Sequence, residues 1–425
     1  MNFILKGNVC YSANARKLKI QQHGYLVCEG GVSRGVFAQL PEQYSAFPLR
    51  DCGDAMIIPG LCDLHLHGPQ YTYRGLGMDL ELLDWLKTHT FPEEARYIEL
   101  DYAQRAYTAF LDDMRRSATT RANIFATIHT PGTLLLMEML EASGLVTNVG
   151  KVNSDRNAPD YLREASAQAS VEGTRAWLEA VRGKFKRTSP ILTPRFVPTC
   201  TGELMGMLGE MQREYSLPVQ SHLSENRGEI AWVRELHPEA ESYGHVYDSY
   251  GLFGGDGVPT VMAHCVWSQG AEEALMRERG VYIAHCPQSN TNIASGIAPV
   301  RRFLDGGQQI GLGTDVAGGC HTSILRAMSD AIGVSKLRWR LVDDGDAPLT
   351  SAEAFYLGTL GGGSFFGKVG SFEPGYEFDA VVFDDSELAT ARPLSVQDRL
   401  ERMIYLSSER MIRAKYVRGR EVDLS

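Results

Sequence analysis

Eight apolar stretches, each ending in or beside a polar or aromatic residue, restrict the fold of this sequence more than any other feature. Most are followed by segments with helical periodicity, such as 80–90, 203–215, 271–279 and 324–337. Eight strand–helix units are what a (β/α)8 barrel requires. The sequence therefore predicts an α/β protein built on a TIM-like barrel. The predicted strands end at or near His65, Thr127, Asn153, Phe196, His222, His264, His285 and Asp315.

The two ends of the chain have a different sequence pattern from the middle. Short β-prone segments at 2–6, 18–21 and 25–28 are separated by glycine and asparagine turn signals, and the pattern returns at 378–384 and 413–417. Chain termini often lie close together on a domain surface. We therefore expect a small composite β-sandwich formed by residues 1–58 and 367–425, with the barrel, residues 59–366, inserted between its halves.

Composition narrows the class of partner. The 425 residues include 42 Lys and Arg against 52 Asp and Glu, a net charge of −10, which does not favour nucleic-acid binding. No apolar run approaches the roughly 18–20 residues of a membrane-spanning helix, and the N-terminus does not resemble a signal peptide. The eight cysteines are dispersed without a C-x-x-C pair. We therefore expect a cytoplasmic protein with reduced cysteines and a small-molecule partner, and no membrane partner.

Histidines and one aspartate at the predicted strand ends indicate a metal site. His65 and His67 are two residues apart on a strand, so both side chains point to the same side. His222, His264 and Asp315 follow at the ends of three later strands. In a barrel of this type these ends meet at the face where active sites form. Imidazoles combined with a carboxylate are typical of zinc sites that keep one position open for water.

A second pattern predicts a general acid or base. Glu225 lies three residues after His222, close enough to reach a water at the metal without binding the metal itself. Gly318 and Gly319 after Asp315 indicate a tight turn beside the metal.

Several motifs resemble the amidohydrolase superfamily: 59–67, 221–225, 313–315 and the closing segment 370–379. More specific stretches resemble its guanine deaminase branch. These are Trp85–Pro92, Phe125–His129, Gly150–Val152, Asn157–Tyr161, Thr193–Phe196, Ser221–Asn226 and Gly313–Gly319. The similarity extends over nearly the whole chain.

The resemblance implies a set of metal and proton-transfer roles. His65, His67, His222 and Asp315 would bind one zinc ion per subunit, although iron stays an open alternative. Glu225 would carry protons, and His264 would hold the reacting water together with Asp315. These three residues, Glu225, His264 and Asp315, form the catalytic set that the resemblance implies.

The resemblance also implies a substrate. Gln70, Arg195 and Phe196 match positions that hold a purine, together with His222 and Glu225. The expected reaction is hydrolysis of guanine to xanthine and ammonia, a step of purine breakdown, in a homodimeric enzyme. Arg195 can donate to the guanine carbonyl oxygen, and Gln70 can both donate and accept along the ring edge.

Three alternatives stay open at this point. The pocket could take another aminated heterocycle, such as 8-oxoguanine or a pterin, because Arg195 and Gln70 suit several lactam rings. A metal-free scaffold is a more distant alternative. Lys151 ends a predicted strand and, if carboxylated, could bridge a second metal.

Trp85, Phe91 and His129 are candidates for lining the pocket, without an assigned role.

Overall fold

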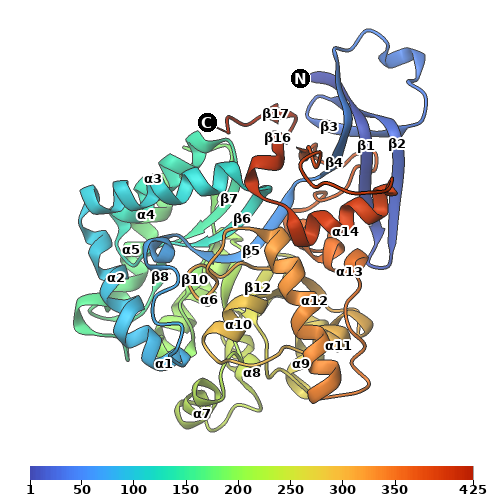
Figure 1. Cartoon of the computed structure of the whole chain (residues 1–425). Helices are drawn as coiled ribbons and strands as arrows, with labels where there is room; N and C mark the ends of the chain where they lie inside the picture. Colours follow the sequence, from blue (N-terminus) through green and yellow to red (C-terminus); the bar gives the residue numbers. More distant parts are fainter. Residues whose placement is uncertain (425) are drawn as a thin grey trace.

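A computed structural model describes residues 1–424 and places the two ends of the chain in one sheet (Figure 1). Seven strands pair in the order β17-β16-β15-β4-β1-β2-β3. β15 pairs antiparallel with β4, with Val381 opposite Ile58, so residues more than 300 positions apart become neighbours. The strands are β1 Asn2–Asn14, β2 Lys17–Glu29, β3 Val32–Phe37, β4 Leu49–Pro59, β15 Ala380–Phe383, β16 Ile412–Val417 and β17 Arg420–Glu421.

The first two strands are longer than the sequence pattern predicts. β1 and β2 form one hairpin in which Asn2 faces Glu29 and Asn14 faces Lys17. Polar residues within β1 hide this length, because they interrupt the apolar pattern on which the prediction rested. Asn8 is one of them, yet it is buried, and its amide donates to the backbone and carboxylate oxygens of Asp54 at 2.9 and 2.8 Å. A buried polar group that is fully paired is compatible with a strand interior.

The middle of the chain contains parallel strands in two four-stranded sheets, β5-β6-β7-β9 and β11-β12-β13-β14. A short parallel pair, β10-β8, lies beside them. The fourth predicted strand is divided between β9 and β10. The bounds are β5 Leu61–His67, β6 Thr119–Phe125, β7 Val146–Gly150, β8 Val152–Asn153, β9 Thr188–Pro190, β10 Thr193–Pro194, β11 Val219–Leu223, β12 Thr260–His264, β13 Tyr282–His285 and β14 Gln309–Leu312.

Backbone hydrogen bonds connect the two parallel sheets on both sides. Leu192 pairs in parallel with Val219 of β11. On the other side the Asp315 amide, just past β14, donates to the His65 carbonyl of β5 at 2.9 Å. The predicted α/β class is therefore confirmed.

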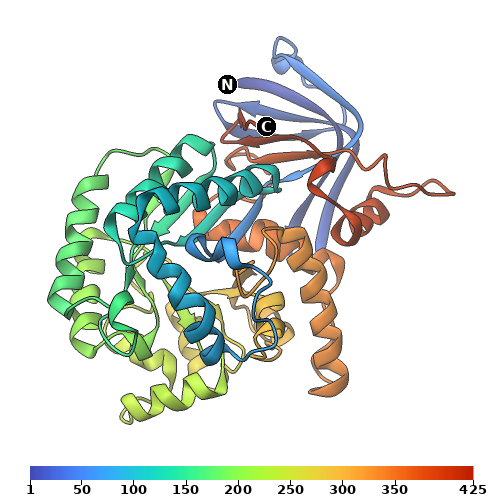
Figure 2. The same ribbon diagram turned by 60° about the vertical axis from the view of Figure 1, so that its left-hand side comes forward.

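Helices lie around the parallel strands, while the terminal sheet projects to one side (Figure 2). The segment predicted as one helix at 80–90 is α1 followed by a π-helical turn, Leu86–Thr90. Among residues 1–424 no helix has the length and hydropathy needed to cross a membrane. The helices are α1 Leu82–Trp85, α2 Phe91–Ala95, α3 Leu100–Arg116, α4 Thr130–Ser143, α5 Ala167–Val181, α6 Gly202–Tyr215, α7 Arg227–Leu236, α8 Tyr243–Ser249, α9 Ala271–Arg279, α10 Pro287–Asn292, α11 Val300–Asp305, α12 Ile324–Leu341, α13 Ser351–Tyr356 and α14 Val396–Leu406.

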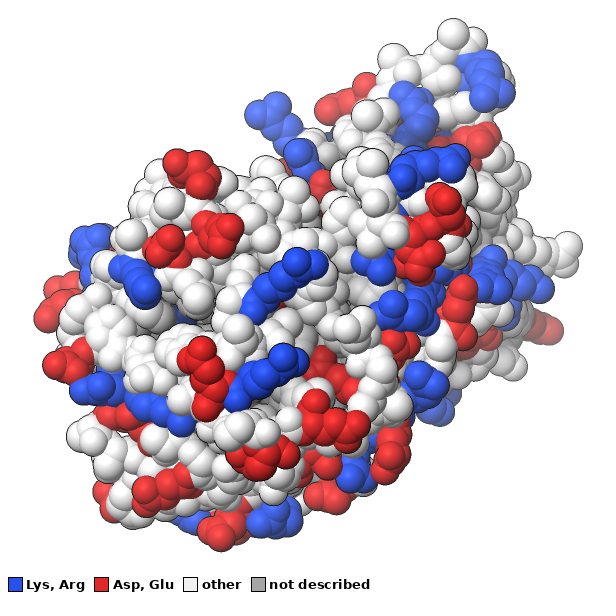
Figure 3. Space-filling view, turned by 90° about the horizontal axis from the view of Figure 1, so that it is seen from below, with Lys and Arg blue, Asp and Glu red and all other residues white. Residues whose placement is uncertain are grey.

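Charged side chains are intermixed on the face seen from below (Figure 3). Two basic side chains are buried inside the molecule with hydrogen-bond partners. Arg121 of β6 is 1% exposed and donates from Nε to Asp379 at 2.6 Å, and its terminal nitrogen donates to Glu377 at 2.7 Å. Lys415 of β16 is fully buried and donates to the carbonyls of Met114, Ser117 and Thr119. These two buried basic side chains join the terminal sheet to β6 and to the end of α3.

Asp379→Ala should lower the free energy of unfolding by about 3–5 kcal/mol, because it leaves Arg121 buried beside a single, partly exposed carboxylate. Denaturant titration of the purified protein measures this difference. Asp51→Ala removes the exposed partner of Lys6 and should leave stability nearly unchanged. Equal losses in the two variants would show that the Arg121 pair does not hold the sheet in place.

Candidate active site

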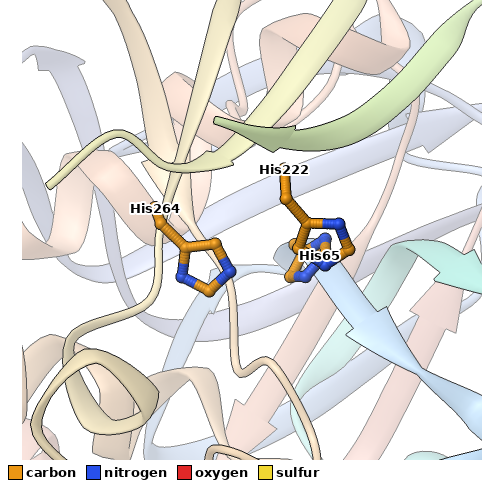
Figure 4. Close-up of side chains that lie close together, drawn as sticks. All are labelled: His65, His222 and His264. Carbon is orange, nitrogen blue, oxygen red and sulfur yellow. The ribbon is translucent and has the colours of Figure 1, made fainter. Parts of the chain in front are cut away.

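The predicted metal-binding residues meet at one end of the parallel strands. His65 and His67 come from β5, His222 from β11 and His264 from the last position of β12, and Asp315 follows β14. The rings of His65, His222 and His264 converge from different strands (Figure 4). His222 is partly buried and the other four are almost fully buried. The sequence prediction that these five residues share one site is therefore matched by their geometry.

The Asp315 carboxylate lies at the centre of the cluster. Its Oδ1 is 3.1 Å from His65 Nε2 and 3.4 Å from His67 Nε2. Its Oδ2 is 3.7 Å from His264 Nε2. His67 Nε2 and His222 Nε2 lie 3.3 Å apart. Several ligand-type atoms thus face a common point at distances that a single ion can span.

The chemistry of these donors fits a metal cation. His222 Nδ1 lies 2.7 Å from the Arg195 carbonyl, which can only accept, so Nδ1 carries the proton and the lone pair of Nε2 points into the cluster. His65 Nε2 is buried and makes no hydrogen bond. Burial lowers the pKa of His65 to about 4 and that of His222 well below its usual value, so both rings are neutral, as metal ligation requires. Three imidazoles and a carboxylate are donors that zinc prefers.

Glu225 lies beside the cluster, in the position predicted for a general acid or base. Its Oε2 is 3.4 Å from His264 Nε2, and its Oε1 accepts a hydrogen bond from Ser295 at 2.9 Å. Burial raises the pKa of Glu225 to about 8, and the negative charge of Asp315 adds to this effect. A carboxyl group with such a pKa can hold or release a proton near neutral pH.

The backbone is unusual at three positions of the site. Ser224, His264 and Asp315 have φ angles of 46°, 73° and 47°, in the left-handed region that non-glycine residues rarely adopt. Strain of this kind persists where the surrounding structure determines it, and it is common at functional sites. Here it turns the chain sharply where β12 and β14 lead into the loops of the site, so that His264 and Asp315 reach the cluster.

A pocket opens onto the cluster and includes nearly all the predicted site residues. His65 lies outside its lining. Trp85 lines the pocket, whereas His129 does not, and Phe91 lies outside it with its ring 5.1 Å from the Arg195 guanidinium. The lining residues are His67, Gln70, Leu82, Trp85, Leu86, Arg195, Phe196, His222, Glu225, Glu229, His264, Ile293 and Asp315.

Three buried carboxylates around this pocket were missed from the sequence: Asp63, Glu94 and Glu229. Asp63 Oδ1 accepts from the Thr314 amide at 3.0 Å and the His65 amide at 3.2 Å, tying β5 to the loop after β14. Glu229 accepts from the Glu225 amide at 3.1 Å. A signal for Glu229 existed, because asparagine at 226 followed three residues later by glutamate resembles a capping box.

Lys151, considered above as a bridging ligand, is paired elsewhere. It is buried, and its Nζ lies 2.5 Å from Glu164 and 3.3 Å from the Val152 carbonyl. Its amine therefore has a structural partner in this conformation.

Comparison with known proteins identifies the family of the chain. The amidohydrolase family model matches residues 56–422. Guanine deaminase of Dictyostelium discoideum is 38% identical over 380 residues, covering 88% of this chain and 83% of its own length. Guanine deaminase of Homo sapiens is 38% identical over 381 residues, covering 86% and 82%. The crystal structure of guanine deaminase from C. acetobutylicum with bound guanine has a TM-score of 0.96 and 44% identity, covering 100% of both chains.

The chain therefore belongs to the amidohydrolase family. Within that family it falls in the guanine deaminase branch, as the identity and coverage of these relatives show.

Asp315→Ala should weaken Zn²⁺ binding by more than about a hundredfold, because it removes the carboxylate that faces His65, His67 and His264. Equilibrium dialysis of the metal-depleted protein against Zn²⁺, with metal analysis, measures the affinity. His129→Ala is a matched control, because this histidine lies near a strand end outside the pocket lining. Similar affinities in wild type and Asp315→Ala would contradict a metal site at the cluster.

Proposed function

We propose that the protein is a zinc-dependent guanine deaminase that hydrolyses guanine to xanthine and ammonia. The observation that carries the proposal is the juxtaposition of buried Glu225 with the histidine–aspartate cluster in a pocket lined by Gln70 and Arg195. The similarity to a guanine deaminase crystallised with guanine supports it, because the two chains match over their whole length.

In this proposal His65, His67, His222 and Asp315 hold one zinc ion per subunit. When bound, zinc supplies Lewis acidity that makes water a competent nucleophile near neutral pH. The backbone carbonyl of Arg195 keeps His222 in the tautomer that this role needs. Burial lowers the pKa of His65 and of His222, so protons do not compete with the metal for these two rings.

Protons move through Glu225. It takes a proton from the attacking water and delivers it to the ring nitrogen next to C2, while the water oxygen forms a bond to C2. It then transfers the second proton of that water to the amine. The C2–N bond breaks, ammonia leaves, and C2 becomes a carbonyl carbon. His264 and Asp315 orient the water, and His264 is itself oriented by a hydrogen bond of 2.8 Å between its Nδ1 and Asn290 Oδ1.

Ring recognition belongs to Gln70, Arg195 and Phe196, with His222 and Glu225 completing the substrate contacts. All five line the same pocket. Arg195 donates to the carbonyl oxygen of guanine, Gln70 pairs with the ring edge, and Phe196 offers an apolar surface.

We also propose the finer architecture. Residues 59–366 form a (β/α)8 barrel, supported by the hydrogen bonds that link the two parallel sheets at Leu192 and at Asp315. Residues 1–58 and 367–425 form the composite β-sandwich domain, supported by their shared sheet. A cytoplasmic homodimer is part of the same proposal.

Zinc-loaded wild-type protein should convert guanine to xanthine, and its kcat/KM for guanine should exceed that for 8-oxoguanine and for pterin. The absorbance change of each substrate measures the three rates. Absence of guanine turnover in protein shown to contain zinc would contradict the proposed function. A preference for 8-oxoguanine or pterin would replace guanine by the preferred heterocycle.

Glu225→Gln should lower kcat by about 10²- to 10⁴-fold with zinc content unchanged, because an amide keeps the shape of the side chain but cannot carry the proton. Steady-state kinetics on guanine and metal analysis of the same sample measure both effects. Glu235→Gln changes an exposed glutamate of α7 and should leave both quantities unchanged. A near-normal kcat for Glu225→Gln would remove this residue from proton transfer.

A further inference from the structure

Glu94 is a buried carboxylate that touches two of the pocket residues without lining the pocket itself. It lies on α2, is 3% exposed, and pairs with both terminal nitrogens of Arg195, with Nη2 at 3.2 Å from Oε1. The same Oε1 accepts from Gln70 Nε2 at 2.8 Å. One carboxylate therefore holds both polar side chains that the proposed function assigns to ring recognition.

This contact fixes which way the Gln70 amide points. The Ala317 backbone N–H can only donate, and it lies 3.1 Å from Gln70 Oε1. The ionised Glu94 carboxylate can only accept, and it faces Nε2. The two orientations of the amide are thus no longer equivalent, and Gln70 presents one defined arrangement of donor and acceptor to the pocket.

The same contact determines the charge at this end of the pocket. Arg195 is 5% exposed, and its guanidinium lies over the Phe91 ring at 5.1 Å as well as against Glu94. The Arg195–Glu94 pair is formally neutral, so the pocket receives N–H donors without net positive charge. Such a surface suits an uncharged carbonyl oxygen, and it disfavours both an anionic group and an amino group, which would place donor against donor.

We propose that Glu94 is a positioning residue that makes the pocket selective for a carbonyl at C6 of a 2-aminopurine ring. It acts through Arg195 and Gln70 and does not touch the substrate. This inference rests on the proposed guanine deaminase function. It assigns selectivity to Glu94 and not to the adjacent Glu93, whose carboxylate accepts a hydrogen bond from Thr72 and lies near Arg96.

Glu94→Gln tests the proposal. It keeps the size of the side chain but leaves Arg195 without its counter-charge and places an amide nitrogen where Gln70 or Arg195 needs an acceptor. We expect kcat/KM for guanine to fall by about tenfold to a hundredfold, mostly through KM. For 2-aminopurine, which lacks the C6 oxygen, and for 2,6-diaminopurine, which carries an amino group there, we expect little change. Inhibition constants replace kcat/KM where turnover is too slow to follow.

Matched variants separate positioning from general loss of stability. Arg301 and Glu353 form a second buried pair with two hydrogen bonds of 2.7 Å, away from the pocket. Glu353→Gln should lower thermal stability and leave substrate preference unchanged. Glu94→Asp keeps the charge and should retain part of the preference, and it stands in for Glu94→Gln if that variant does not fold. The kcat for guanine should be nearly the same in wild type and both Glu94 variants, because Glu94 does not touch the reacting groups.

The outcomes are distinguishable. A folded Glu94 variant whose preference for guanine over 2-aminopurine equals that of wild type overturns the positioning role while leaving the deaminase function intact. An equal loss of preference in Glu353→Gln overturns it too, because any buried pair would then have the same effect. Wild-type protein that contains zinc but does not turn over guanine overturns the proposed function and this inference with it.

Discussion

The burial of the Asp315 carboxylate among imidazoles is the constraint on which the site depends. A carboxylate removed from water must have partners, or it takes up a proton. Burial by itself raises the pKa of Asp315, but the neighbouring rings of His65, His67 and His264 outweigh this effect and hold it well below its usual value. These contacts exist only where the strand ends meet, so the geometry of the cluster depends on the meeting of β5, β12 and β14.

Buried ion pairs extend this principle to the rest of the molecule. Arg121 with Asp379 joins β6 to the segment leading into β15, and Arg195 with Glu94 joins the loop after β10 to α2. Such pairs add little net stability over apolar packing, but they are costly to break, which makes them effective in specifying one arrangement. The composition and net charge of the chain do not predict these internal pairs. Each pair forms between residues more than a hundred positions apart in the sequence.

The sequence revealed the cluster but not its supports, and the reason is physical. Strand ends in a parallel α/β protein share one edge, so His222, His264 and Asp315 could be placed together from apolar runs alone. Glu94 and Asp63 have no such signal, because a short helix and a single carboxylate in a strand resemble ordinary surface or turn positions. Their partners are fixed by tertiary packing. The length of β1 was missed for the same reason, since the partner that pairs with buried Asn8 is Asp54, on a strand 46 residues later.

The metal end and the ring-recognition end of the pocket are built on the same two chain segments. Residues 65–70 carry two of the proposed zinc ligands and then Gln70, while residues 315–317 carry the central carboxylate and then the amide that orients Gln70. The His67 amide donates to the Val316 carbonyl at 3.0 Å, so the two segments are bonded to each other between these groups. A displacement of the metal-binding side chains would therefore also displace Gln70 at the other end of the pocket. In the proposed reaction, C2 of the ring would have to lie within reach of Glu225. The shared backbone would then fix the distance between that carbon and the groups that bind the opposite edge of the ring.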